Sequence, residues 1–431
     1  MLASKLSKYG STILLFLASQ NISLFGSSIV QYAITWYITL TTQSGLMMTL
    51  AIICGFLPTF IVSPFAGVWA DRYNRKTLII LADSTIAVVT LILAVLFFLG
   101  YNPLWLLFVV LSIRSIGAGV HMPAVGAVIP QLVSQDKLMK INAANGSLQS
   151  LMTFIAPMIS GVLLAVAAIE VAFFIDVITA AIAISILLLF VHIPSHEKAS
   201  VKQKIGYFQD LKVGIKYISS QSYLKALFAF AAVFFFLVAP AAFLSPLQVT
   251  RTFGGDVWRL TAVEVAFSVG MISGGILIAA WGGFKNKAYS MALSTLIMGT
   301  LTFALGLTPF FWLYLLFMGI FGVALPMFNV PATVFLQEKT DPNFMGRVFG
   351  VLGMISSVMM PFGMIFFGPV VDFVAIEWLM IASGLLIFVM GVLMFRNKTL
   401  IEAGKPLIIE EAVTNGERQP GSSGIEPAHK D

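Results

Sequence analysis

Long apolar runs dominate the chain and set its predicted architecture. A helix crosses a bilayer with about 20 apolar residues, because no water is present there to satisfy the backbone. Twelve such runs lie at residues 11–40, 46–69, 77–99, 103–131, 138–167, 170–194, 223–250, 257–282, 286–307, 310–336, 343–370 and 375–396. The runs are continuous and do not alternate, which argues against a β-barrel. We predict an all-α integral membrane protein with twelve transmembrane helices in two six-helix bundles.

Composition excludes the main soluble classes. Hydrophobic residues make up 59% of the 431 positions and charged residues 10%, against about 25% charged in soluble domains. A soluble enzyme, a nucleic-acid-binding protein and a disordered scaffold are therefore ruled out. The single cysteine, Cys54, lies inside an apolar run and permits neither an intramolecular disulfide nor a cysteine-based metal site. We expect no cofactor, no metal and no nucleic-acid partner.

The basic residues predict the orientation. With the N-terminus placed in the cytoplasm, 22 of the 25 Lys and Arg fall on the cytoplasmic side, Arg251 and Arg259 fall outside, and Arg114 lies within a span. Short cytoplasmic loops carry such an excess. The first apolar run is too long for a cleaved signal peptide and lacks a convincing cleavage site. We predict a multi-pass protein of the bacterial cytoplasmic membrane with both termini in the cytoplasm.

The chain divides into two halves joined by a polar segment. We expect an N-terminal six-helix half at 1–194, a basic cytoplasmic linker at 195–222, a C-terminal six-helix half at 223–396 and a disordered tail at 397–431. Each half carries the same series of residues: a proline inside its fourth apolar run, an acid in the loop that follows, and a proline inside its fifth run. In order these are Pro123, Asp136 and Pro157, and Pro331, Asp341 and Pro361. Such a duplication is typical of secondary transporters, whose substrate site lies between the halves.

The loop after the second run carries a charged motif. It reads Gly67-Val-Trp-Ala-Asp71-Arg72-Tyr-Asn-Arg75-Lys76 and resembles the G-x-x-x-D-R-x-x-R-K signature of the major facilitator superfamily. A carboxylate at a helix end beside three cations can form an ion-pair network that differs between two conformations. The matching loop of the second half, 282–287, keeps positive charge but lacks the acid. The resemblance implies the major facilitator fold.

Further segments narrow this resemblance. Arg114 stands in a run similar to the arginine motif of the superfamily's fourth helix, and Ala156-Pro157 stands where drug antiporters usually have Gly-Pro. Other segments resemble the macrolide-efflux branch; they are Gly55-Phe56-Leu57-Pro58, 113–117, 145–150, 335–339 and 346–349. That resemblance implies proton-driven export of macrolides or other bulky amphipathic compounds. Related branches export siderophores or move lysophospholipids.

Ionisable side chains inside the spans are the first functional candidates, because burying a charge in a membrane costs several kcal/mol. The four that we expect to handle protons are Asp83, Arg114, Asp176 and Glu264. A carboxyl that moves between water and an apolar cavity can load and release a proton, and Arg114 can lower the pKa of a neighbouring acid. Glu170 and Asp372 lie near external span ends, where we expect them to be solvated.

The candidate carboxyls differ in position. Glu264 lies several residues into its span and starts a stripe with Ser268, so we favour it as the proton carrier. Asp83 lies near the cytoplasmic end of its span and has an alternative role as a structural partner of a basic loop residue. Asp176 lies near the external end, where capping or pairing is the alternative. For Arg114 the alternative to coupling is structural hydrogen bonding.

Polar stripes at helical spacing supply candidate cavity residues. They are Gln20, Ser23, Ser27, Gln31 and Thr35 in the first span, and Asn142, Asn145, Gln149, Thr153, Pro157 and Ser160 in the fifth. Each stripe lies on one helix face and should point away from lipid, either as the wall of a hydrated cavity or in interhelical hydrogen bonds. We add His121, two turns after Arg114, and Asn329 to the candidates for the cavity wall.

Three function classes follow from these observations. The leading hypothesis is a proton-coupled exporter of bulky amphipathic drugs, working by alternating access as a monomer among membrane lipids. The second is a siderophore or lysophospholipid transporter, although Arg114 is the only deep cation available for an anionic cargo. An intramembrane enzyme is a remote third class, because no histidine belongs to a recognisable catalytic motif and no phosphate-binding loop is present. No catalytic residue is therefore assigned.

Overall fold

The computed structural model describes residues 2–193, 207–342 and 344–405, and these residues form helices and no strands. Twelve segments are long and apolar enough to span a membrane. This confirms the predicted fold class. The first six are α1 (Leu2–Thr42), α2 (Gly45–Arg72), α3 (Arg75–Phe98), α4 (Leu104–Leu132), α5 (Gln135–Val166) and α6 (Ile169–Phe190). The seventh span covers Ser222–Phe253, and the others are α10 (Val257–Trp281), α11 (Lys287–Leu307), α12 (Phe311–Lys339), α13 (Met345–Val370) and α14 (Ile376–Arg396).

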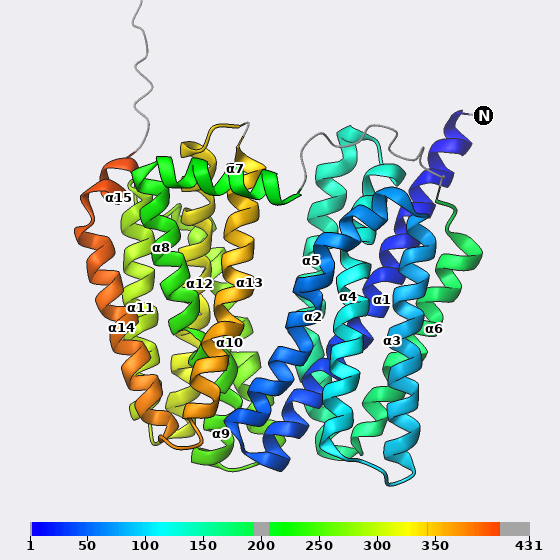
Figure 1. The fold of residues 1–431 in the computed structure, drawn as a ribbon, viewed down its shortest axis with the longest axis horizontal. Helices are drawn as coiled ribbons and strands as arrows, with labels where there is room; N and C mark the ends of the chain where they lie inside the picture. The colour runs from blue at the N-terminus through cyan, green and yellow to red at the C-terminus, as the bar shows by residue number, and fades with distance from the viewer. Residues whose placement is uncertain (1, 194–206, 343, 406–431) are drawn as a thin grey trace, which may run out of the picture.

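The helices form two bundles that stand side by side (Figure 1). In the N-terminal bundle α1 packs on α5 and α6, and α4 packs on α2 and α3. In the C-terminal bundle α11 packs on α12 and α14, and α10 packs on α12. Small residues allow the closest approaches, since a Cβ added at Gly270 would lie 2.0 Å from the carbonyl oxygen of Gly319. Such contacts are how membrane helices associate without a hydrophobic drive between them.

The seventh span departs from a regular helix. It consists of α8 (Ser222–Leu237), a π-helical turn η1 (Pro240–Leu244) and α9 (Ser245–Phe253), where the sequence predicted one continuous run. Pro240 has no backbone N–H to donate, and its ring disturbs the preceding turn. The wider turn that results is a common site of function in membrane and soluble helices. Here it turns Phe243 toward Phe56 of α2, with ring centroids 6.1 Å apart.

The bundles meet at one end and separate at the other (Figure 1). We call the end with α7 (Tyr207–Ser220) and the start of α1 the linker end, and the opposite one the far end. At the far end α2 packs on α13 and α5 packs on α10. Trp36 of α1 lies there in an apolar cluster with residues of α10 and α12. Toward the linker end α2, with Pro58 and Pro64 inside it, curves away from α13.

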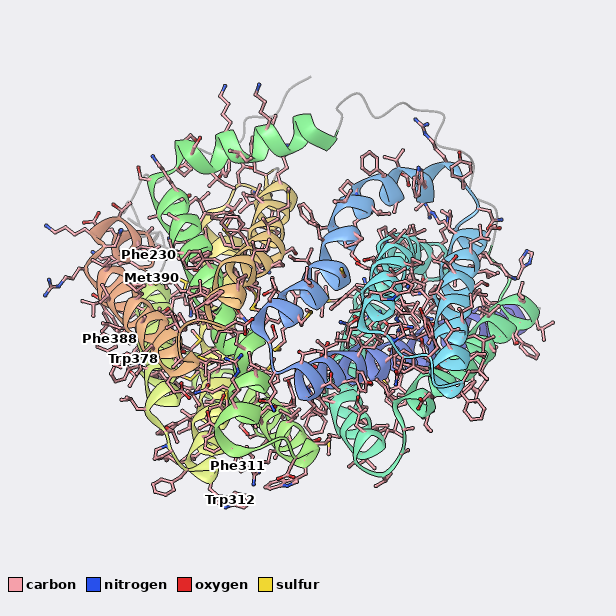
Figure 2. The ribbon with its side chains drawn as sticks, turned by 60° about the horizontal axis from the view of Figure 1, so that its bottom comes forward. Phe230, Phe311, Trp312, Trp378, Phe388 and Met390 are labelled. Carbon is pink, nitrogen blue, oxygen red and sulfur yellow. The ribbon has the colours of Figure 1, made fainter. Side chains whose placement is uncertain are left out.

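Tryptophans mark the far end of the bundle. Trp105, Trp258, Trp312 and Trp378 each lie in the first turn of a span that begins there, and all are exposed. Figure 2 shows Trp312 and Trp378 on the outer surface of the C-terminal half. Indole rings favour the boundary between lipid and water. The ring of tryptophans is therefore the pattern expected where the spans leave a bilayer.

Two segments outside the predicted spans contain helices. Within the expected linker 195–222, α7 lies across the linker end and packs on α13. The disorder expected from residue 397 does not apply to α15 (Lys398–Ala403), because the Asn397 side chain caps its first turn by accepting from the Leu400 N–H at 2.9 Å. The rest of the predicted tail, and residues 195–206 of the linker, lie outside the described residues.

Candidate functional site

A buried ion pair lies at the centre of the N-terminal bundle. The Arg114 guanidinium on α4 donates to the Asp176 carboxylate on α6 and to the Thr90 hydroxyl on α3. It also donates to the Ser27 carbonyl oxygen on α1 at 3.2 Å. Arg114 is 6% exposed and Asp176 is fully buried. A buried charge pair of this kind persists only when both groups are paired and hydrogen-bonded, and here four helices supply the partners.

A second acidic group lies beside this pair. Asp83 on α3 is 3% exposed, and its Oδ1 accepts a hydrogen bond from the Ser23 hydroxyl on α1 at 3.1 Å. His121 Nε2 on α4 lies 3.4 Å from the same oxygen, within ion-pair range but outside hydrogen-bond geometry. The other carboxylate oxygen, Oδ2, is buried and accepts no hydrogen bond from the described residues.

Arg114 of the ion pair and Asp83 both line one small pocket. It has a volume of about 130 Å³, and its wall includes Asp83, Arg114, His121, Ser27 and Gln31. Three members of the polar stripe on the first span, Ser23, Ser27 and Gln31, line this pocket. Two of them also make interhelical hydrogen bonds. The Ser23 and Ser27 hydroxyls donate to the carboxylates of Asp83 and Asp176.

A larger cavity lies between the two bundles. Its volume is about 570 Å³, and α2, η1 and α13 line it. The wall carries no ionisable side chain and is made of aromatic, methionine, hydroxyl, proline and glycine residues. They are Phe56, Thr59, Phe60, Ser63, Pro64, Phe243, Gly350, Gly353, Met354, Ser356, Ser357, Met360 and Pro361. A site of this size and composition suits a mostly apolar ligand recognised by shape, with a few hydroxyl contacts.

The remaining predicted residues occupy several surroundings. Gln20 is buried and donates to the Ser19 hydroxyl at 3.1 Å, and Asn145 accepts from Asn21 at 3.2 Å. Gln149 is half-buried on α5, and Asn329 is exposed on α12. None of these four lines the pocket or the larger cavity.

Glu264 lies apart from the other predicted carboxyls. It is half-buried on α10 of the C-terminal bundle, which packs on α5 of the N-terminal bundle. This position is in the contact between the bundles, toward the far end. The favoured carboxyl of the sequence is therefore outside both the pocket and the cavity.

The charged loop between α2 and α3 lies at the linker end. Arg75 pairs with Asp71 at 3.4 Å and also donates to the carbonyl oxygens of Ala70 and Ala127. Lys76 donates to the Val191 carbonyl oxygen at 2.8 Å, and Arg72 is exposed. The motif thus connects α2 to α4 and to the end of α6.

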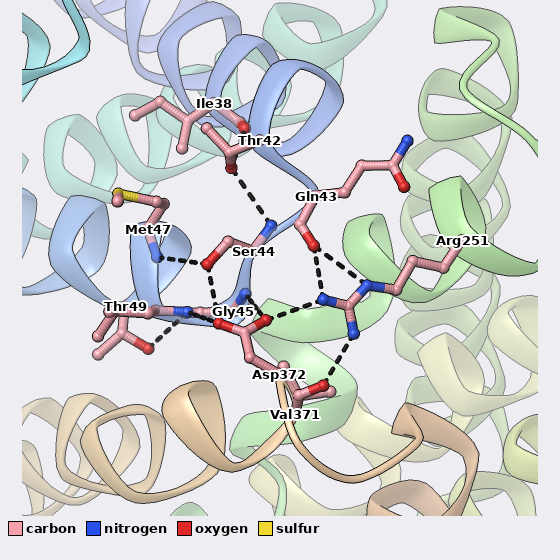
Figure 3. Close-up of polar contacts among 11 residues, drawn as sticks. Ile38, Thr42, Gln43, Ser44, Gly45, Met47, Thr49, Arg251, Val371 and Asp372 are labelled. Atoms are coloured by element: carbon pink, nitrogen blue, oxygen red, sulfur yellow. Dashed lines mark hydrogen bonds and ion pairs between the residues drawn. The ribbon is translucent and has the colours of Figure 1, made fainter.

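A network that sequence reasoning missed joins the halves at the far end (Figure 3). Asp372, between α13 and α14, accepts from the Gly45 and Leu46 N–H groups at 2.8 and 3.0 Å and from the Ser44 hydroxyl at 2.8 Å. Arg251 of α9 pairs with Asp372 at 2.8 Å and donates to the Gln43 carbonyl oxygen. We call these five contacts the far-end latch. Asp372 is exposed, as expected for an acid near a span end, but it also joins the two halves, which the sequence did not indicate.

The latch explains the charge state of Asp372. Burial raises the pKa of this carboxyl, but the hydrogen bonds from Leu46, Gly45, Ser44 and Arg251 outweigh burial and hold the pKa below its usual value. The carboxylate also stands at the N-terminus of α2, where the helix dipole favours a negative charge. A lone acid at a predicted span end gave no signal of this role, since its partners are more than 100 residues away.

Two bundles, a cavity between them and buried charges within one of them define a secondary transporter of the major facilitator type. A family model described as Major Facilitator Superfamily matches residues 16–364. The chain belongs to this superfamily. Macrolide efflux proteins are among the members to which the chain aligns over most of its length, at 31–32% identity.

Three relatives differ in how much of the chain they match. Macrolide efflux protein A of Streptococcus pyogenes is 32% identical over 377 residues, which are 87% of this chain and 93% of the relative. The protein of the same name from Enterococcus faecalis is 31% identical over 323 residues, or 74% of this chain and 99% of the relative. The staphyloferrin A transporter of Staphylococcus aureus is 26% identical over 204 residues, or 47% of this chain and 50% of the relative.

Solved structures share the fold at low sequence identity. A bacterial homologue of the human lysosomal transporter Spinster, in an inward-facing and unoccupied conformation, has a TM-score of 0.67 at 14% identity and covers 93% of this chain and 99% of its own. The nucleoside transporter NupG has a TM-score of 0.67 at 13% identity, covering 89% of this chain and 98% of its own. These likenesses concern the fold alone.

Proposed function

We propose that this protein is a proton-coupled secondary transporter that exports macrolides or other bulky amphipathic drugs by alternating access. The observation that carries the proposal is the uncharged cavity between α2 and α13, in a chain 32% identical to a macrolide efflux protein over 87% of its length. The halves touch at the far end and part toward the linker end, which is one end state of a rocking cycle.

The cavity wall supports a neutral or weakly cationic cargo. Phenylalanine and methionine side chains adapt to varied apolar surfaces, and the serine and threonine hydroxyls offer a few hydrogen bonds. A siderophore carries several negative charges and would favour cationic side chains around it. The related staphyloferrin A transporter keeps the siderophore class as the second candidate, and a lysophospholipid is the third, because its acyl chain would also suit the apolar wall.

The proton gradient is an adequate source of free energy. One charge crossing 100 mV yields about 2.3 kcal/mol, and a tenfold gradient of a neutral solute costs about 1.4 kcal/mol. The titratable groups within the spans, Asp83, Asp176, Glu264 and His121, are the candidates that would exchange protons with the two sides of the membrane.

We further propose that the linker end faces the cytoplasm of a bacterial cell and that the transporter works as a monomer. The excess of Lys and Arg in the loops assigned to that end supports this orientation. Export then requires that cargo binds from the linker end and leaves at the far end after the latch opens. Membrane lipid surrounds both bundles.

Transport by purified protein tests the proposal. Proteoliposomes with an imposed pH gradient are loaded with a radiolabelled macrolide, and the wild type is compared with protein-free vesicles and with the cavity variant Phe243→Ala. We expect gradient-driven movement by the wild type and at least a threefold lower apparent affinity in the variant, because one ring of the wall is removed. Movement of a siderophore or lysophospholipid instead of the macrolide would overturn the cargo assignment.

A further inference from the structure

The small pocket inside the N-terminal bundle is separate from the cavity between the halves. Its volume is about 130 Å³, enough for a few water molecules, and none of its wall residues belongs to the larger cavity. A ligand of the pocket therefore does not compete with cargo for the same atoms. The two sites are nevertheless adjacent, since Gly55 of α2 lines the pocket and the next residue, Phe56, lines the cavity.

The pocket contains unsatisfied polar atoms. Asp83 is 3% exposed, yet its Oδ2 accepts no hydrogen bond from the described residues, and His121 Nε2 makes none either. A buried acceptor without a partner costs free energy, more so when it is charged. A proton or a proton-carrying water between these groups would remove that cost. His121 is 14% exposed, so it is the more accessible member of the pair.

The charges around the pocket do not balance. The titratable or charged groups in its wall are Asp83 on α3 and His121 and Arg114 on α4, while α1 and α2 contribute uncharged residues. Asp176 on α6 is not part of the wall but contacts Arg114 directly. Arg114 and Asp176 neutralise each other by direct contact. Asp83 then leaves one negative charge, which a single added proton neutralises. Removal of a net charge is favourable in a desolvated site.

We propose that Asp83 and His121 form the proton-binding site of the transport cycle, and that the Arg114–Asp176 pair is its fixed support. This inference rests on the proposed proton-coupled export and names the residues that perform the coupling. One proton binds to the Asp83–His121 pair from the exterior in one state and leaves to the cytoplasm in the other. Glu264 is not needed for this step, because it lies outside the pocket.

A spectroscopic titration tests proton binding without any cargo. Infrared difference spectra of the full-length protein in liposomes are recorded as a function of pH, and the carboxylic acid C=O band is compared between the wild type and Asp83→Asn. We expect a titrating band in the wild type that the variant loses and that His121→Gln shifts in pH. Asp256→Asn, the same change at an exposed carboxylate, should keep the band. A band that persists unchanged in Asp83→Asn would overturn the inference.

Transport assays separate this inference from the proposed function. We expect Asp83→Asn to lose at least tenfold in gradient-driven macrolide transport while it retains equilibrium exchange of macrolide, which needs no net proton movement. Retention of exchange also shows that the variant is folded. Gradient-driven transport that survives in Asp83→Asn but is lost in Glu264→Gln would overturn the assignment and leave the proposed function intact. If the wild type moves no macrolide in either assay, the proposed function is wrong. The infrared titration then still tests whether Asp83 and His121 bind a proton.

Discussion

Arg114 illustrates how a single buried residue acquires its role from its surroundings. The sequence left its role open between coupling and structural hydrogen bonding. In the structure it bonds to a carboxylate, a hydroxyl and a carbonyl oxygen from three other helices. Each of these contacts joins α4 to another helix of the N-terminal bundle, so that α1, α3, α4 and α6 meet at Arg114 beside the pocket. This arrangement favours the structural role, which variants of either charged partner can test.

Breaking this pair on one side should destabilise the protein strongly. Asp176→Asn leaves a buried guanidinium without its counter-charge, and such changes cost about 3–5 kcal/mol. We expect a clear fall in the melting temperature of the detergent-solubilised protein, measured by intrinsic fluorescence. The double variant Arg114→Gln with Asp176→Asn should recover part of the loss, because neither charge is then uncompensated. Equal or additive losses in the single and double variants would contradict the pairing.

Among the elements, the loops at the far end and the π-helical turn set how the halves fit. The Asp372 carboxylate from the α13–α14 loop caps the N-terminus of α2, while Arg251 at the end of α9 donates to the carbonyl oxygen of Gln43, two residues before that helix. The cap and the Arg251–Gln43 hydrogen bond therefore join the two halves, whereas the Arg251–Asp372 ion pair lies within the C-terminal half and holds both groups in place. The π-helical turn η1 places Phe243 in the wall of the cavity between the halves, next to Phe56 of α2.

The latch predicts a measurable shift in conformation. Asp372→Asn removes the charge from several hydrogen bonds, and we expect the contact between halves to weaken by about 1–2 kcal/mol, or five- to thirtyfold in the population of the state closed at the far end. Distances between spin labels placed on the two halves at the far end, measured by double electron–electron resonance, report that population. Glu377→Gln, which changes a nearby half-buried acid that accepts from Thr252 within the same half, is the matched control. An unchanged distance distribution in Asp372→Asn would contradict the latch.

The pKa of Asp372 gives the latch a defined pH dependence. Its value is lower in the closed state than the usual 3.8, so the charge stabilises closure fully above that usual value. This stabilisation is lost only as the pH falls through the lowered value. Between neutrality and about pH 5 the same distance measurement should therefore show no opening that depends on Asp372. We therefore expect that the latch is not itself a proton sensor in this pH range.

At the scale of the whole molecule, the orientation of the bundle decides the direction of transport. The described chain starts and ends at the linker end, where α1 begins and α15 ends. In a Cys54→Ser background, Glu402→Cys on α15 should react with a membrane-impermeant maleimide only after the cells are permeabilised. Asp256→Cys at the far end, also exposed, should react in intact cells and serves as the matched control. The opposite pattern would reverse the proposed direction.

The sequence by itself determined the number of spans, the class of fold and the charged loop at residues 67–76. These properties depend on local hydrophobicity and on motifs of adjacent residues, because a lipid environment forces each apolar run into a helix. It also indicated which polar residues share a helix face. The α1 stripe lies inward because such faces avoid lipid, whichever helices happen to surround it.

Only the tertiary structure decided which charges meet. Asp83 and His121 are 38 positions apart, Arg114 and Asp176 are 62 apart, and Arg251 and Asp372 are 121 apart. Helix spacing relates residues within one span, but partners on different helices depend on how the bundles pack. The same reason explains why Glu264, favoured from its depth in a span, lies outside the pocket, and why Asp372, assigned to solvent, joins the two halves.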